Sequence, residues 1–380
     1  MNTRYRPLLL GPLLLGVGAV LALTSYLGPA GVPSSSSSSS SPTTPAARAA
    51  HPAAPAATTP TATRSVDDPI NRVLAVSVDG LNPRAIRRLG PKGAPAFHRL
   101  MRQGAFTLNA RTAHEQTRTL PNHTSMLTGR RVDDRRGGHG VTFNSDTGTT
   151  VHRAAGGYVS SVFDIVHDRG GRTALFTTKT KFALYKRTWN THGAADRVGA
   201  DQGRAKIDRF TVDTNDTRLV AEVNSYLKSS PGQFTFLHVS LPDEAGHQHK
   251  FMSKRYLAAV QHTDRLLATV LDTVAISPTL RHTLVLVTAD HGGDGGSHSN
   301  PQKLQNYRVP FLAWGPGVPA GQDLYRLNRD LRSPGQARTT YRGRQPIRNG
   351  DLANLATDVL DLPRVPGSEL NASRKLTVVR

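Results

Sequence analysis

Residues 73–80 read VLAVSVDG, and this stretch decides the fold that the sequence predicts. The apolar run from Val73 to Val78 is typical of a strand buried on both faces in the middle of a sheet. Asp79 and the turn-forming Gly80 follow it directly. Later segments of the same character are Thr173–Thr177, Phe234–Ser240, Leu284–Thr288 and Val309–Trp314.

Segments with a helical pattern of apolar residues alternate with these strands. They span Pro95–Gln103, Tyr158–Asp168, Thr217–Leu227, Tyr256–Val274 and Asp351–Leu360. Gly104 and Gly170–Gly171 follow the first two segments and are expected to end them. Alternating strands and helices favour a mostly parallel sheet with helices on both faces. We therefore predict an α/β fold, built as a three-layer αβα sandwich.

Polar side chains follow three of the predicted strands at the point where each strand ends. They are Asp79 after the first strand, Asp243 and His247 after FTFLHVS, and Asp290 and His291 after LVLVT. In open α/β sheets, ligands bind at the carboxyl ends of the strands. Three separate strands are thus expected to deliver Asp and His residues to one edge of the sheet.

Each of these pieces is weak evidence alone, since an Asp-Gly after a strand is ordinarily a turn. The spacing of Asp243 and His247 allows both side chains to lie on one side of a helical turn, as metal ligands often do. With His298 included, the group holds three carboxylates and three imidazoles. Such ligands suit zinc, with manganese or iron as less favoured ions, and six of them divide naturally between two ions. The competing interpretation is a set of unrelated surface turns.

A nucleophile is expected in the segment TRTLPNHTSMLTGR at 117–130. Thr119 precedes Leu120 and Pro121, and a helix is predicted to start here with Asn122 or Thr124 as its N-cap. A threonine hydroxyl becomes an effective nucleophile when a metal ion lowers its pKa. The amino end of a helix also favours an anionic phosphoryl group. By itself, the segment is equally typical of a plain capping turn.

Together these segments resemble the alkaline phosphatase superfamily, specifically its type I phosphodiesterase/nucleotide pyrophosphatase branch. The matching stretches are VSVDG at 76–80, TRTLPNHTSMLTGR at 117–130, HGV at 139–141, LPDEAGH at 241–247, VTADHGG at 287–293 and RVPFLAWGPG at 308–317. The resemblance implies two zinc ions and a covalent phosphothreonine on Thr119. It implies that one zinc is held by Asp79, Asp290, His291 and Thr119, and the other by Asp243, His247 and His298. Asn144 would donate a hydrogen bond to a phosphoryl oxygen.

The chain also departs from the pattern of this branch. Leu120 stands where an aromatic residue usually follows the nucleophile. The interval from Thr119 to His139 is longer than usual, so Asn144 can equally be read as an ordinary turn residue. His298 lies only seven residues after His291, where nucleotide-cleaving members carry a long insertion. This short interval argues against a nucleotide as the default substrate.

Other polar residues near the motifs receive less specific interpretations. His123, His139 and His249 are expected to support the structure rather than bind metal. Lys179 and Lys181 follow the TALFT strand and would either meet an anionic substrate or lie in a solvated loop. Asp294 would either support His298 or belong to the glycine-rich turn.

The amino-terminal part of the chain is expected to lie outside the catalytic domain, which is predicted to span residues 66–380. Arg4 and Arg6 precede an apolar run, so residues 1–27 predict a signal peptide or a membrane anchor. Residues 28–65 are rich in Ser, Pro, Ala and Thr and predict a disordered linker. The catalytic domain is therefore expected outside the cytoplasm, secreted or attached through the amino-terminal segment.

Composition limits the classes of partner. The 380-residue chain has no cysteine, which excludes disulfides and thiolate metal ligands. Its net charge of +21 is consistent with an anionic cell-surface polymer as partner, or with biased residue usage. Basic stretches interleaved with aromatic residues are missing from the sequence, so specific nucleic-acid binding is not expected.

We expect a small-molecule or envelope phosphate ester as substrate of a phosphodiesterase or phosphatase. A phosphonate- or sulfate-ester hydrolase on the same fold is the nearest alternative. The formylglycine type of sulfatase is disfavoured because the nucleophile segment has neither Cys nor a C/S-x-P-x-R pattern. A non-catalytic, basic envelope-binding protein is the alternative from a different class.

Overall fold

The computed structural model of the chain describes residues 69–379. Within that range, one eight-stranded sheet has the order β4-β3-β5-β1-β6-β7-β2-β8. The strands are β1 Arg72–Val78, β2 Ala105–Arg111, β3 Thr173–Thr177, β4 Arg209–Val212, β5 Phe234–Val239, β6 Thr283–Thr288, β7 Arg308–Trp314 and β8 Gln322–Asp323. Strand pairing is parallel except where β7 meets β6 and β2.

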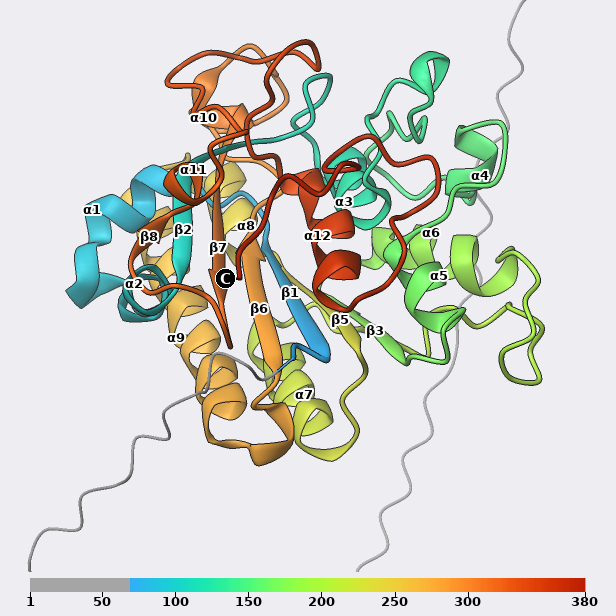
Figure 1. The fold of residues 1–380 in the computed structure, drawn as a ribbon. Coiled ribbons are helices and arrows are strands. Elements are labelled where there is room, and N and C mark those ends of the chain that lie inside the picture. The colour runs from blue at the N-terminus through green and yellow to red at the C-terminus, as the bar shows by residue number, and fades with distance from the viewer. Residues whose placement is uncertain (1–68, 380) are drawn as a thin grey trace, which may run out of the picture. The chain divides into compact units, whose positions relative to one another are not determined.

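Helices cover both faces of this sheet (Figure 1). One layer contains the long helix α9 with its contacting helices, and the other contains α3, α5 and α12. The helices are α1 Pro83–Gly93, α2 Pro95–Gln103, α3 Thr119–Thr128, α4 Val151–Ala154, α5 Val162–His167, α6 Ala183–Lys186, α7 Asp216–Ser229, α8 Leu241–His249, α9 Lys254–Ile276, α10 Leu304–Tyr307, α11 Leu324–Leu327 and α12 Leu352–Val359. The predicted three-layer α/β sandwich with a mostly parallel sheet is confirmed.

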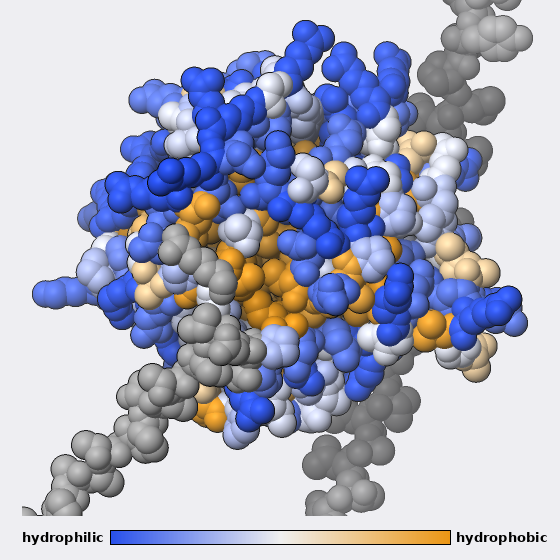
Figure 2. All heavy atoms as spheres, viewed as in Figure 1, coloured by the Kyte–Doolittle hydropathy of each residue, from blue (hydrophilic) through white to orange (hydrophobic). Residues whose placement is uncertain are grey.

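The core lies between the sheet and the two helical layers. The residues of β1, β3, β5 and β6 are almost all buried, as continuous apolar runs in central strands predict. Hydrophilic residues cover most of the face shown in Figure 2, while hydrophobic residues gather around its centre. In Figure 1 this central region is where β1 and β6 are seen. The apolar pattern of the sequence therefore located the core strands correctly.

One predicted helix is wrong in extent. Tyr158–Asp168 was expected to be helical throughout, but α5 spans only Val162–His167. Ser161 is its N-cap, and it forms a capping box with Asp164 in which each side chain accepts from the other's backbone N–H. This local pairing starts the helix later than the apolar periodicity suggests. Strands β2, β4 and β8 were not predicted from the sequence.

The predicted segments 1–27 and 28–65 lie outside the described residues. Within residues 69–379, no helix combines the length and the apolar composition needed to cross a bilayer.

Asp264 of α9 ties that helix to the start of α2, and its replacement is expected to destabilise the domain. The buried carboxylate accepts hydrogen bonds from Ala96 N–H at 3.0 Å and Phe97 N–H at 2.8 Å. Asp264→Ala would leave both donors without this acceptor and should lower the free energy of unfolding by about 2 kcal/mol. Urea denaturation measures the change, with Asp264→Asn as the milder variant. A value within about 0.5 kcal/mol of wild type would contradict this role.

Candidate active site

Four neighbouring strands deliver most of the site from their carboxyl ends. In the order of the sheet, β3 leads to Lys179, β5 to Asp243, β1 to Asp79, and β6 to Asp290. Because β1 pairs in parallel with both β5 and β6, the residues that follow these strands emerge at one edge of the sheet. The convergence expected from the sequence is present in the structure.

Gly80 allows the end of β1 to approach α8 closely. Its φ of +69° lies in the left-handed region, which glycine adopts without a steric cost. A Cβ atom at this position would also lie 2.9 Å from the Cα of Asp243. The glycine therefore brings Asp79 and Asp243 together.

Asp79, Asp290 and His291 form the first group of buried acids and imidazole. The Nε2 atom of His291 lies 3.3 Å from Asp79 Oδ1 and 3.1 Å from Asp290 Oδ2. The other oxygen of Asp290 accepts hydrogen bonds from the backbone N–H groups of Gly80 and His291. These bonds fix the carboxylate so that its Oδ2 faces the imidazole.

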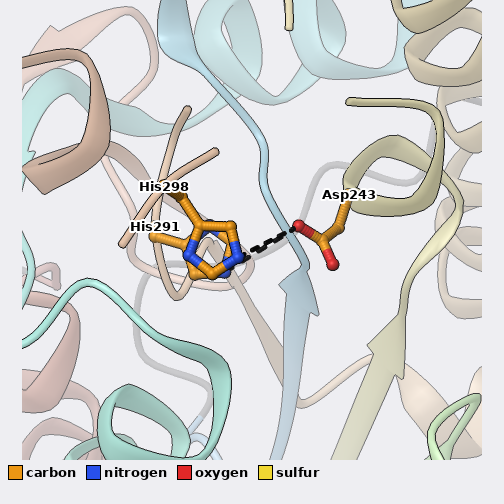
Figure 3. A group of neighbouring side chains, drawn as sticks. All are labelled: Asp243, His291 and His298. Atoms are coloured by element: carbon orange, nitrogen blue, oxygen red, sulfur yellow. Dashed lines mark ion pairs between the residues drawn. The ribbon is translucent and has the colours of Figure 1, made fainter. Parts of the chain in front are cut away.

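Asp243, His298 and His291 form the second group (Figure 3). Asp243 Oδ1 lies 3.7 Å from His298 Nε2 and 4.0 Å from His291 Nε2. The two imidazole rings stack with centroids 3.5 Å apart. His247 joins from the same helix as Asp243, with its Nε2 3.4 Å from Asp243 Oδ1 and 3.1 Å from His298 Nε2. His247 is the most exposed member of this group.

Backbone carbonyls orient all three imidazoles. The Nδ1 atoms of His247, His291 and His298 donate to the carbonyl oxygens of Gly296, Gly292 and Thr117, respectively. A neutral imidazole that donates from Nδ1 presents an unprotonated Nε2. Burial, followed by the neighbouring His298, holds the pKa of His291 well below its usual range. With Nδ1 bonded to a carbonyl, each ring has its Nε2 turned toward the carboxylates, as ligation requires.

The site contains buried polar atoms that have no hydrogen-bond partner among residues 69–379. They are Asp79 Oδ1, Thr119 Oγ1, Asp243 Oδ1, Asp290 Oδ2 and His291 Nε2. Buried polar atoms normally have partners, and a cluster of acceptor atoms without them fits the binding of cations. Carboxylate and imidazole donors suit zinc, and the two groups offer places for two ions. The residues present therefore fit a metal centre of the predicted kind.

Lys179 binds the carboxylate oxygens that face away from the imidazoles. Its Nζ lies 2.6 Å from Asp79 Oδ2 and 2.6 Å from Asp243 Oδ2. Burial raises the pKa of Asp79, but Lys179 and then His238 outweigh burial and bring it well below its usual range. Burial and the charges of Asp79 and Asp243 raise the pKa of Asp290 well above its usual range. Without cations, the site thus carries more negative charge than Lys179 neutralises.

Thr119 is the first residue of α3, not a residue before it. The prediction that Asn122 or Thr124 caps this helix is wrong, because both lie inside α3. The Asn122 side chain instead accepts from Ala113 N–H and donates to the carbonyls of Gln116 and Arg118. It thereby holds the loop before Thr119 against the first turn of the helix.

Asn144 lies beside α3, the helix that begins with the predicted nucleophile Thr119 and is called the nucleophile helix below. Its Oδ1 accepts a hydrogen bond of 2.9 Å from the backbone N–H of Leu120, the residue after Thr119. This contact leaves the Nδ2 of Asn144 as the donor side of the amide. Although 24 residues separate Asn144 from Leu120 in the chain, the structure brings the two together.

Hydrogen bonds show the roles of His123, His139 and Asp294, three further polar residues near the motifs. His123 bonds Thr119 O and Ser77 Oγ, and His139 bonds Ser125 Oγ and Val141 N–H. Both therefore fill structural roles, as expected from the sequence. Asp294 contacts Lys303 and the backbone of Ser297, so it belongs to the turn.

Two residues that contact the site, His238 and Asn349, were not predicted from the sequence. His238, inside β5, contacts Asp79 Oδ2 at 3.1 Å, and its only signal was a histidine within an apolar strand. Asn349 donates to Asn122 Oδ1 and to the carbonyls of Ala289 and Asp290. It connects α3 to the loop that carries Asp290, and no pattern in the sequence marks it.

Comparison with curated proteins gives relatives that match part of the chain. GPI ethanolamine phosphate transferase 1 of Yarrowia lipolytica is 28% identical over 175 residues, covering 41% of this chain and 18% of that protein. The corresponding protein of Saccharomyces cerevisiae is 29% identical over 133 residues, covering 33% of this chain and 13% of that protein. The matched region thus spans less than a fifth of these relatives.

Comparison with solved structures shows the fold. Murine ectonucleotide pyrophosphatase/phosphodiesterase 5 superposes with a TM-score of 0.56 at 14% identity, covering 81% of this chain and all of that chain. A sulfatase of glycosaminoglycan metabolism from Bacteroides thetaiotaomicron gives a TM-score of 0.53 at 13% identity, covering 78% of this chain and 74% of that chain.

Comparison with protein families is more specific. The family described as type I phosphodiesterase/nucleotide pyrophosphatase matches residues 73–309, more than half of the chain. This range includes Asp79, Thr119, Asp243, Asp290 and His298. The chain belongs to the type I phosphodiesterase/nucleotide pyrophosphatase family, within the alkaline phosphatase superfamily.

Proposed function

We propose that this protein is an exported hydrolase of phosphate esters that binds two zinc ions and forms a covalent phosphothreonine on Thr119. One observation carries the proposal. A buried hydroxyl oxygen, three carboxylate oxygens and an imidazole nitrogen of the site all lack hydrogen-bond partners within residues 69–379. A nucleophile and cation ligands require free atoms of these kinds.

The proposed ligands come from the two acid–imidazole groups together with His247 and Thr119. Asp79, Asp290 and His291, with the Thr119 oxygen, would hold one ion, and Asp243, His247 and His298 the other. When bound, the ions would supply Lewis acidity that favours the alkoxide of Thr119 and offsets charge on the phosphoryl group. The three Nδ1–carbonyl bonds keep the imidazoles ready to bind without reorganisation.

The chain's own residues would act on the phosphoryl group as follows. Thr119 loses its proton to water, and its oxygen attacks phosphorus. The ester oxygen leaves with the electron pair of the broken P–O bond and takes a proton from solvent. The Asn144 amide would offer its Nδ2 hydrogens to the phosphoryl oxygens while its Oδ1 stays bonded to the backbone N–H of Leu120. Water then attacks the phosphothreonine, which returns Thr119 and releases phosphate or a monoester.

A phosphotransferase is the second candidate, and the names of the curated relatives favour it. In that case an alcohol would replace water in the second step. Sulfate-ester hydrolysis is the third candidate, supported by the fold shared with a sulfatase.

For the natural substrate we propose a small-molecule or envelope phosphate ester met outside the cytoplasm. An anionic surface polymer remains a proposed partner for a chain of charge +21.

A comparison of model esters tests the proposed function. The full chain, loaded with zinc, is assayed with p-nitrophenyl phosphate, bis-p-nitrophenyl phosphate and p-nitrophenyl sulfate. We expect at least one phosphate ester to be cleaved about 100-fold faster, by kcat/KM, than the sulfate, since the site would be matched to a phosphoryl transition state. Adding glycerol and analysing products by phosphorus NMR separates hydrolysis from transfer. Faster cleavage of the sulfate would contradict the proposal.

A further inference from the structure

An open cleft adjoins the nucleophile helix on the side of Asn144. Its walls are the turn at Asn144–Asp146 and the segment Thr178–Lys181, and its volume is about 550 Å³. A cleft of this size accommodates a small ester. Two ammonium groups, those of Lys179 and Lys181, lie along one wall.

The two lysines differ in how their charge is balanced. Lys179 is held between the carboxylates of Asp79 and Asp243. Lys181 forms no ion pair within the described part of the chain, and its Nζ lies 3.4 Å from the neutral Asn144 Oδ1. Burial and the nearby Lys179 lower the pKa of Lys181, against the attraction of the carboxylates of Asp79, Asp290 and Asp243, which lie beyond ion-pair distance. The cleft therefore presents a half-buried cation near the proposed ligands that forms no ion pair with any residue in 69–379.

The segment that carries Lys181 is fixed against the nucleophile helix. Tyr185, in α6, is fully buried, and its hydroxyl donates to the carbonyl of Leu120 at 3.1 Å. Asn144 links the same two elements, because its Oδ1 accepts from Leu120 N–H and lies next to Lys181. Lys181 and the backbone N–H of Leu120, the residue after Thr119, thus share one acceptor, Asn144 Oδ1, which places the ammonium group on the side of Asn144 near the proposed nucleophile.

We propose that Lys181 is a specificity-determining residue that binds a non-bridging phosphoryl oxygen and makes the site prefer phosphate monoesters to diesters. This inference rests on the proposed function. A monoester phosphoryl group carries close to two negative charges above pH 7, whereas a diester carries one and has an ester substituent in place of the second anionic oxygen. An ammonium group stabilises an anionic oxygen through a charge-assisted hydrogen bond, which a substituted oxygen cannot match.

The test compares two esters that share one leaving group, p-nitrophenyl phosphate and methyl p-nitrophenyl phosphate. In the zinc-loaded full chain, Lys181→Met is expected to lower kcat/KM for the monoester about 10- to 100-fold and for the diester less than about 3-fold. Lys181→Arg should keep most of the monoester preference. Lys228→Met, an exposed lysine in α7 outside the cleft, is the matched control and should match wild type with both esters.

A binding measurement supplies a readout that does not depend on turnover. Calorimetric titration with inorganic phosphate at pH 8 should show about 10-fold weaker binding to Lys181→Met than to wild type, with unchanged zinc content. Thermal melts confirm folding, and Lys181→Gln replaces the methionine variant if that variant is unfolded. Equal losses on both esters, no loss on either, or a loss confined to the diester would each overturn the inference. If wild type cleaves neither ester, the proposed function itself has failed.

Discussion

Replacing Thr119 with alanine is expected to reduce the cleavage of phosphate esters by about 1,000-fold or more. The reason is chemical, because alanine removes the oxygen that attacks the phosphorus of the substrate in the proposed mechanism. The hydroxyl oxygen of Thr119 is buried and makes no hydrogen bond among the described residues, so its removal breaks no hydrogen bond that supports the fold. The free energy of unfolding should fall only by the cost of the lost buried methyl group, about 1 kcal/mol.

Thr119→Ser is the matched variant for this experiment. It keeps the hydroxyl and should retain activity within about 10- to 100-fold of wild type, because only a methyl group that helps orient the oxygen is lost. Acid quenching with labelled substrate should trap a phosphoprotein from wild type and from Thr119→Ser, but not from Thr119→Ala. Near-wild-type rates in Thr119→Ala would exclude the covalent mechanism, whatever the metal content.

The positions of the three carboxylates of this site could be predicted from the sequence, because they depend only on where the strands end. Asp79 directly follows an apolar run, Asp290 and Asp243 follow one within a few residues, and β1 lies between β5 and β6 in the sheet. In a parallel sheet these positions become neighbours whatever lies between them in the chain. The arrangement of the three carboxylates could therefore be predicted without knowing any side-chain conformation.

Contacts that depend on the reach of side chains could not be predicted in this way. Lys179 was read as either substrate-facing or solvated, yet its ammonium lies between two carboxylates. Asn349 donates a hydrogen bond to Asn122, although 227 residues separate the two in the chain. No periodic pattern of residues in the sequence indicates this contact. The start of α3 was misplaced for a related reason. Asn122 looked like a helix cap by residue type, but its side chain is engaged by the preceding loop.

Lys179 bridges the two acid–imidazole groups of the site. It binds one oxygen from each of Asp79 and Asp243, and those residues belong to different proposed ion sites. The remaining oxygen of each carboxylate is the one that lies toward the imidazoles and lacks a hydrogen bond. Lys179 therefore connects the two groups physically, and a change in one carboxylate is expected to disturb the other.

His291→Ala is expected to have the second largest effect, with the loss of bound zinc and about 1,000-fold lower activity. His291 is the one residue common to both acid–imidazole groups of the site. Its Nε2 is fully buried without a hydrogen-bond partner, 3.1 Å from Asp290 Oδ2 and 3.3 Å from Asp79 Oδ1. Alanine would remove this donor and leave Asp290 facing Asp79 across a cavity, with fewer ligands for any cation between them.

Metal analysis after gel filtration measures this prediction directly, with about two zinc ions expected in wild type and at most one in His291→Ala. His249→Ala is the matched control, because His249 lies on α8 only two residues after His247 but belongs to neither group. It should keep wild-type zinc and activity. A zinc content of two per chain in His291→Ala would refute the proposed ligands, since the ion assigned to Asp79, Asp290 and His291 would then bind without its imidazole. Zinc lost equally from His249→Ala would show that the histidines of this region act through the fold and not through ligation.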